Sequence, residues 1–131
     1  MKSILISIKP DYFTKIVTGI KTVEVRKFQL ETPFIVYLYL TKGQKVTRNG
    51  EEENGKIVAS FCVSHIDTYL NPQDYIIGSC LTEREIREYA RGKTIFGWHI
   101  SNLVIFDHPL QLESFGIKKA PQNYCYLKES K

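Results

Sequence analysis

The chain has 131 residues, of which 43% are hydrophobic and 24% are charged, as is typical of a soluble globular protein. No apolar run approaches the roughly 20 residues with which a helix spans a bilayer, so no membrane-spanning helix is expected. The formal net charge is +4 and the sequence pI is about 8.9, so the composition permits an anionic partner without requiring one.

The three cysteines, Cys62, Cys80 and Cys125, are odd in number and widely spaced. They form no C-x-x-C pair and no Cys/His pair at zinc spacing, so we expect reduced thiols and no metal or other cofactor. The apolar run at the N-terminus is too short for a signal peptide. We therefore expect a cytoplasmic protein that does not associate with a membrane.

Alternating isoleucines at 4–8 predict a buried strand. Apolar residues then recur at helical spacing over 10–18, with Pro10 suited to the first helical position and Gly19 to the residue after the helix. A second strand is expected over 21–28.

Later segments follow the same logic. Residues 34–40 are rich in β-branched and aromatic residues, and 57–69 predicts a long, bent strand that ends at Asn71-Pro72. Between them, residues 41–56 carry charges of both signs and the turn signal Asn49-Gly50, which predicts a solvated hairpin or loop.

The next helix has a recognisable beginning, because Thr82 and Glu85 form a capping box. Gly92 is expected to end that helix. The remaining elements are a long strand over 94–107, a single helical turn over 110–115 and a short strand over 122–127.

The connections between the middle strands are too short for crossover helices, so the sheet must be mixed and mostly antiparallel. We expect an α+β fold in which a small curved sheet or open barrel is flanked by two or three helices. Neither an internal repeat nor a linker is evident, and residues 1–131 are expected to form a single domain.

Three charged residues follow the first helix within six positions: Lys21, Glu24 and Arg26. In a strand, Glu24 and Arg26 share one face, and Val23 and Val25 share the other. A carboxylate beside a guanidinium, with an ammonium close by, suits the recognition of polar nucleobase edges.

The simpler explanation is an ion pair on the strand surface, which contributes only about 0–1 kcal/mol. A general-base role for Lys21 would require its pKa to fall from about 10.4 to near 7. An ionised Glu24 opposes that fall, so a charged Lys21 that binds anions is favoured.

Three further residues are weaker candidates for the same site. His99 and Ser101 share a strand face with Gly97, and Tyr124 could stack on a base. Each of these side chains could instead have only a structural role, hydrogen-bonded to a neighbour or packed in the sheet. Trp98 is expected in the core. His65 and His108 carry no recognisable signal.

Taken together, several segments resemble the ASCH domain of the PUA-like superfamily, in the form found in bacteria and phages. They are Ile8-Lys9-Pro10, Lys15-Ile16, the G-x-K-x-x-E-x-R element (Gly19, Lys21, Glu24, Arg26), residues 98–107 and residues 120–126. The resemblance implies a PUA-like pseudo-β-barrel over residues 1–131 with a cleft between barrel and helix. It also implies binding of RNA, or of a nucleoside or nucleotide.

The same resemblance leaves catalysis open. One relative hydrolyses N4-acetylcytidine with a lysine that matches Lys21, a threonine whose position Glu24 occupies here, and a later glutamate that corresponds to Glu83 or Glu85. Other relatives have been proposed as ribonucleases. A small hydrolase using Lys21 and Glu24 is therefore one alternative to an RNA-binding module, and a protein-interaction domain is another.

Overall fold

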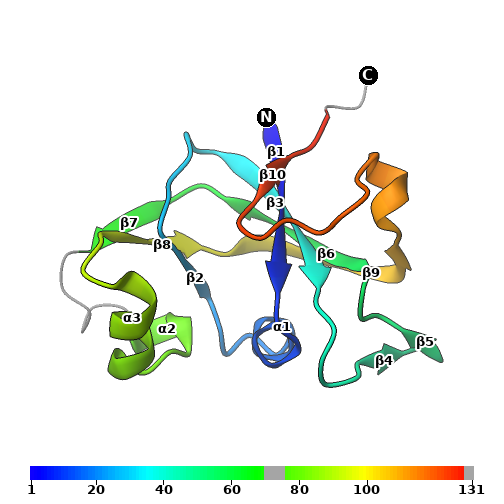
Figure 1. Ribbon diagram of the computed structural model, residues 1–131, viewed down its shortest axis with the longest axis horizontal. Coiled ribbons are helices and arrows are strands. Elements are labelled where there is room, and N and C mark those ends of the chain that lie inside the picture. Colours follow the sequence, from blue (N-terminus) through cyan, green and yellow to red (C-terminus); the bar gives the residue numbers. More distant parts are fainter. Residues whose placement is uncertain (70–75, 129–131) are drawn as a thin grey trace.

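A computed structural model describes residues 1–69 and 76–128 of the chain (Figure 1). In chain order its elements are β1 (Lys2–Ile8), α1 (Pro10–Val17), β2 (Val23–Arg26), β3 (Phe34–Leu40), β4 (Thr47–Arg48), β5 (Glu51–Glu52), β6 (Ile57–Val63), β7 (Ile66–Tyr69), α2 (Ile76–Ser79), α3 (Glu83–Ala90), β8 (Ile95–His99), β9 (Ser101–Leu110), a 3-10 helix (Leu112–Phe115) and β10 (Cys125–Tyr126).

The described strands form a five-stranded sheet in the order β10-β1-β3-β6-β9, a three-stranded sheet in the order β2-β8-β7, and the hairpin β4-β5. Only β1 and β3 run parallel among these pairs; α1 and β2 lie between them in the chain. This mixed, mostly antiparallel α+β arrangement confirms the predicted fold class.

Two of the predicted long strands are divided between the two sheets. The segment 57–69 passes from β6 to β7, and the segment 95–110 passes from β8 to β9 at Ile100. Asn102 then adopts a left-handed φ of +51°, which breaks the regular side-chain alternation. Because β6 pairs with β9 and β7 pairs with β8, the same two segments join both sheets into a partly open barrel.

The main core lies inside this barrel. Along β3 the alternate residues Phe34, Val36, Leu38 and Leu40 are fully buried, as the pattern of a half-buried strand requires. Trp98 of β8 packs in the same cluster and is fully buried, which confirms its expected core position.

Helix α3 packs on the three-stranded sheet through a smaller cluster (Val25, Ile86, Ala90 and Ile95). The predicted capping box begins the helix: Thr82 Oγ1 accepts from the Glu85 amide at 3.1 Å, and Glu85 Oε1 accepts from the Thr82 amide at 3.0 Å. These two hydrogen bonds fix the first turn of α3, which carries Glu85; Figure 1 shows α3 and α1 on the same edge of the molecule.

The polar segment 41–56 forms the expected hairpin, with Asn49-Gly50 at its turn, but it is not wholly solvated. Glu53 is only 1% exposed and accepts from Arg48 at 2.9 and 2.7 Å. Arg48 also donates to the Phe106 carbonyl of β9. The charges in this segment therefore attach the hairpin to the barrel, which the sequence pattern did not predict.

The cysteines Cys62, Cys80 and Cys125 are free thiols. Every helix within the described residues is too short or too polar to span a lipid bilayer. The predicted strand end at Asn71-Pro72 lies outside the described residues.

Candidate functional site

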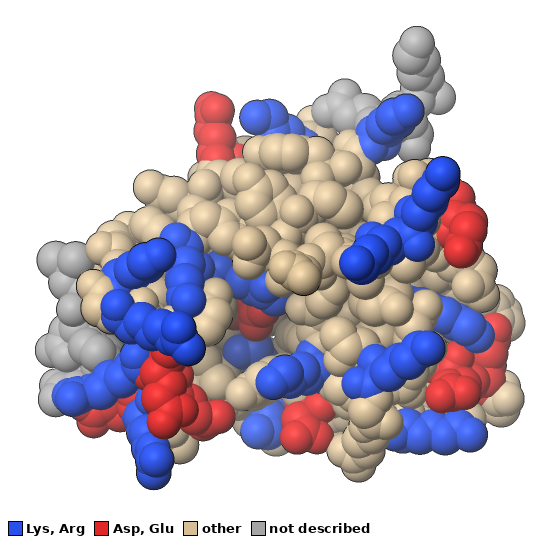
Figure 2. All heavy atoms as spheres, viewed as in Figure 1, with Lys and Arg blue, Asp and Glu red and all other residues tan. Residues whose placement is uncertain are grey.

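A cleft of about 490 Å³ opens between α1 and α3, with β2 along its floor. Its size lies within the range of small-molecule sites, about 300–1,000 Å³. Figure 2 shows this face hollowed near its centre, with basic and acidic side chains within the hollow. The cleft is lined by Ser7, Ile8, Lys9, Tyr12, Lys21, Glu24, Val25, Arg26, Leu81, Glu85, Glu88 and Tyr89.

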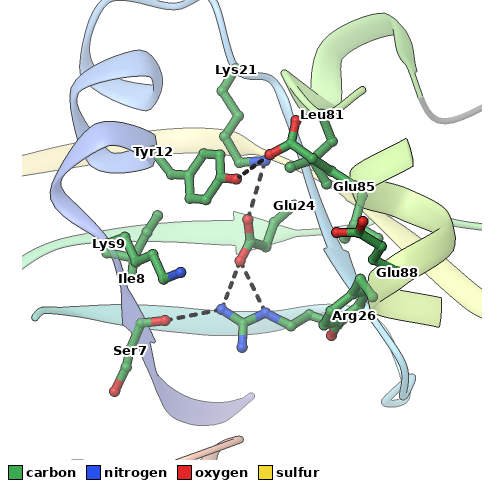
Figure 3. A pocket seen from close by; sticks show the side chains of 12 residues that line it. Ser7, Ile8, Lys9, Tyr12, Lys21, Glu24, Arg26, Leu81, Glu85 and Glu88 are labelled. Atoms are coloured by element: carbon green, nitrogen blue, oxygen red, sulfur yellow. Dashed lines mark hydrogen bonds and ion pairs between the residues drawn. The ribbon is translucent and has the colours of Figure 1, made fainter. Parts of the chain in front are cut away.

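Lys21, Glu24 and Arg26 meet at the floor of this cleft (Figure 3). Arg26 Nε and Nη2 both donate to Glu24 Oε2, at 3.0 and 2.7 Å, and Nη2 also donates to the Ser7 carbonyl oxygen at 3.1 Å. Lys21 Nζ lies 3.4 Å from the other carboxylate oxygen, Glu24 Oε1. The three side chains are 2%, 9% and 14% exposed for Lys21, Glu24 and Arg26, so this is a buried charge cluster.

Lys21 reaches the cluster because it precedes the strand rather than lying within it. Its amide donates to the Lys15 carbonyl oxygen at 2.9 Å as the chain turns after α1, and its Nζ donates to the Ser79 carbonyl oxygen at 2.6 Å. The α2 segment is pinned beside it, because the Thr22 amide donates to the Gly78 carbonyl oxygen at 2.8 Å. A Cβ on Gly78 would lie 2.6 Å from Thr22 Oγ1, so this close approach requires glycine.

Opposing effects act on the pKa of Glu24. Burial favours the neutral acid, but the charges of Arg26 and Lys21 and the hydrogen bonds they donate outweigh it, so the pKa of Glu24 lies below its ordinary value. Two cations and one anion leave a net charge of +1 at the floor. The walls add Lys9, Glu85 and Glu88, so the whole lining is formally neutral and the positive charge is confined to the floor. Glu24 Oε1 can accept a further hydrogen bond there.

The lowered pKa of Glu24 predicts a loss of stability in acid. Its contribution is present above the ordinary glutamate pKa of 4.5 and is lost as the pH falls through the folded-state value. The Glu24→Gln variant has no carboxyl group at this position, so its stability lacks this pH dependence. We expect the difference in free energy of unfolding between the wild type and Glu24→Gln to narrow below pH 4.5, as measured by urea denaturation. A constant difference from pH 6 downward would contradict this assignment.

The walls of the cleft contain residues that the sequence pattern did not single out. Tyr12 of α1 donates from its hydroxyl to Glu85 Oε2 at 3.3 Å, which connects the two helices across the cleft. The Tyr12 ring lies 5.3 Å from Lys21 Nζ, and the Tyr89 ring lies 4.6 Å from Lys27 Nζ. A tyrosine on a short helix gives no local signal of a ligand, so only the packing of the two helices reveals these walls.

Of the two glutamates that the resemblance left open, Glu85 lines the cleft. Glu83 instead accepts from Arg87 at 2.6 Å one turn further along the helix. Glu88, which the sequence did not indicate, also lines the cleft and accepts from Arg84 at 3.1 Å.

His99, Ser101 and Tyr124 do not line this cleft. Because β8 ends at His99 and β9 begins at Ser101, the two residues lie in different sheets. Ser101 donates to the Cys62 carbonyl oxygen at 2.9 Å, and the Tyr124 ring stacks on Phe28 with centroids 4.3 Å apart.

His99 instead lies against Asp67 on β7, with Nε2 2.6 Å from Oδ2. The hydrogen bonds from His99 and Tyr69 lower the pKa of the Asp67 carboxyl to about 2. The carboxylate is therefore ionised at neutral pH.

Comparison with known proteins gives a structural likeness only. No protein-family model matches the sequence, and no curated protein matches it. The fold is similar to the crystal structure of the ASCH protein of Zymomonas mobilis, with a TM-score of 0.76 and 19% identity over 98% of this chain and 89% of that one.

Two mutants of the same Zymomonas mobilis protein give similar values. A tyrosine-to-phenylalanine mutant has a TM-score of 0.77 and 18% identity, covering 98% of this chain and 92% of that one. A serine-to-alanine mutant has a TM-score of 0.77 and 19% identity, covering 98% and 89%. The likeness is one of fold: over nearly its whole length this chain has the fold of the Zymomonas mobilis ASCH protein.

Proposed function

We propose that the cleft between α1 and α3 binds a nucleotide of single-stranded RNA. The observation that carries the proposal is the buried cluster of Lys21, Glu24 and Arg26 at the floor of a cleft large enough for a nucleoside. Charged groups held on a strand and by backbone carbonyls are fixed before a ligand arrives, which lowers the entropic cost of recognition.

The two oxygens of Glu24 are used unequally. Oε2 accepts both hydrogen bonds from Arg26, whereas Oε1 has only the longer contact with Lys21. An exocyclic amine or a ring N–H of a base donates to such an oxygen, as on cytosine or guanine. The net positive charge of the floor cluster, with Lys9 beside it, favours the phosphate of the same nucleotide on the side of the cleft away from the Glu85 and Glu88 carboxylates.

The test measures the affinity of short single-stranded RNAs as a function of salt by isothermal titration calorimetry. We expect Arg26→Ala to weaken binding by about 1–3 kcal/mol and to reduce the slope of log K against log salt by about one. Arg26→Lys should keep most of that slope, because the positive charge remains. It should still lower the affinity, because lysine cannot make both hydrogen bonds that Arg26 donates to Glu24.

Lys45→Ala is the matched control, because it removes one charge from an exposed residue outside the cleft. Lys21→Met keeps most of the buried volume and should weaken binding as Arg26→Ala does. Folding of each variant is checked by circular dichroism. If the wild type and a folded Arg26→Ala/Lys21→Met double variant bind RNA with equal affinity, RNA does not bind in this cleft.

A second candidate function is hydrolysis of a modified nucleoside, favoured by the position of Glu85. This carboxylate lines the same cleft as Lys21 and Glu24, as the resemblance to an N4-acetylcytidine hydrolase requires of a later glutamate. Lys21 is less suited to the role of base, since its Nζ already donates to Ser79 and faces the Glu24 carboxylate.

Chromatography after incubation with N4-acetylcytidine separates the two functions. Product that disappears in the Lys21→Met variant supports the hydrolase, while binding without product supports the RNA-binding module. Incubation with mixed RNA tests ribonuclease activity in the same way.

A further inference from the structure

A second cluster of polar side chains lies away from the cleft, where β7 and β8 pair. The antiparallel ladder places Asp67 opposite Gly97, and the His99 amide donates to the His65 carbonyl oxygen at 3.1 Å. Alternate residues of a strand share a face, so His65 and Asp67 project on the same side as His99 of the neighbouring strand. Two imidazoles and one carboxylate therefore converge where these two strands pair.

The contacts within this cluster are short. His65 Nε2 lies 2.8 Å from Asp67 Oδ1, and His99 Nε2 lies 2.6 Å from Asp67 Oδ2. The two imidazole rings are 4.9 Å apart, and one donor atom from each of the three residues lies within 4.8 Å of the others. Each histidine therefore contacts a different oxygen of the Asp67 carboxylate.

Neighbouring residues hold the carboxylate in place. The Tyr69 hydroxyl donates to Asp67 Oδ2 at 2.7 Å. Its ring lies over Gly97, where a Cβ would be 2.7 Å from Tyr69 Cε2, so the absence of a side chain at Gly97 permits this arrangement. A hydrogen-bonded outer residue that orients a ligating carboxylate is a usual part of metal sites.

We propose that His65, Asp67 and His99 bind a divalent transition-metal ion of the Zn²⁺ type. Two imidazole nitrogens and one carboxylate oxygen are ligands that such an ion prefers, and three protein ligands leave a fourth position for water. Asp67 supplies a negative charge. The side chains are 66%, 34% and 43% exposed for His65, Asp67 and His99, so a hydrated ion can reach them.

The cluster needs little rearrangement to accept the ion. Zinc bonds of about 2.0–2.1 Å in tetrahedral geometry separate neighbouring ligand atoms by about 3.3 Å. The nitrogen–oxygen distances of 2.8 and 2.6 Å therefore need to open by roughly half an ångström. The two imidazole nitrogens, which lie within 4.8 Å of each other, must also reach the tetrahedral separation. Rotations of the two imidazoles, 66% and 43% exposed, can supply both changes while the strands stay in place. The competing explanation is a hydrogen-bonded surface cluster that binds no metal.

The test uses untagged protein of residues 1–131 and titration calorimetry with ZnCl₂. We expect one ion per chain, with affinity reduced more than about tenfold by His65→Gln or His99→Gln. His108→Gln is the matched control, because His108 is exposed, lies outside the cluster and should leave the affinity unchanged. His65→Gln should disturb folding least, since His65 is the most exposed of the three.

Two spectroscopic measurements locate the ion. On addition of Zn²⁺, the imidazole NMR signals of His65 and His99 should shift, whereas those of His108 should not. The Co²⁺ derivative should show d–d absorption without a thiolate-to-metal charge-transfer band. A thiolate-to-metal charge-transfer band would overturn the proposal and assign the ion to a free cysteine instead. Zinc binding that His99→Gln leaves unchanged, or no zinc binding by the wild type, would also overturn it.

Discussion

Replacing Glu24 with alanine is expected to lower the free energy of unfolding by about 3–5 kcal/mol. The carboxylate is the only anion in the buried cluster, and its removal leaves Lys21 and Arg26 close together with their charges uncompensated. Desolvated charges without a partner are costly, unlike exposed pairs that water can replace. A loss of this size is a large fraction of the roughly 5–15 kcal/mol that stabilises an ordinary domain.

Urea denaturation of the wild type and Glu24→Ala measures the effect. Glu88→Ala is the control, because Glu88 lines the same cleft but forms an exposed pair with Arg84, worth about 0–1 kcal/mol. Adding Lys21→Met to Glu24→Ala should recover part of the loss, since it removes one of the two stranded charges. If Glu24→Ala costs no more than Glu88→Ala, the cluster is not electrostatically coupled as described.

Replacing Trp98 with alanine is expected to cost about 3–5 kcal/mol through the cavity it leaves. The indole is fully buried, and it meets the rings of Phe28 and Phe34 edge-on with centroids 5.1 Å away in both cases. Its Nε1 also donates to the Phe28 carbonyl oxygen at 3.3 Å. The side chain therefore joins β8 to β3 and to the segment after β2.

Denaturation followed by circular dichroism compares Trp98→Ala with two other variants. Trp98→Phe keeps most of the aromatic contact and should cost less than Trp98→Ala. Val104→Ala removes an apolar group that is 52% exposed and should stay within about 0.5 kcal/mol of the wild type. Similar losses for Trp98→Ala and Val104→Ala would show that the indole does not support the core.

Local sequence signals predict the elements of this fold well. The capping box at Thr82, the alternation along residues 34–40 and the glycine after α1 each depend on a few neighbouring residues, and each forms where expected. The division of two long strands between sheets is different, because it depends on which partners the chain finds at a distance. Periodicity predicts that residues 95–110 are extended but does not place the break at Ile100.

The site shows the same division between local and distant information. Lys21, Glu24 and Arg26 are close in sequence, so their convergence could be predicted from one motif. Tyr12 and Glu85 meet only because α1 and α3 pack on opposite sides of the cleft. The polar cluster on β7 and β8 was missed for a similar reason, because His99 is 32 residues from Asp67. An alternating His-x-Asp on a predicted strand was the available local signal.

The fully buried Trp98 is the chain's single tryptophan, so its intrinsic fluorescence comes from one known position. Trp98 pairs with Glu24 on one side and Ile66 on the other, and it directly precedes His99. A paramagnetic ion such as Cu²⁺ at the proposed histidine site would quench the indole emission. A nucleotide in the cleft carries no paramagnetic centre. One native chromophore thus provides a label-free signal for a paramagnetic ion at the histidine site, separate from occupancy of the cleft.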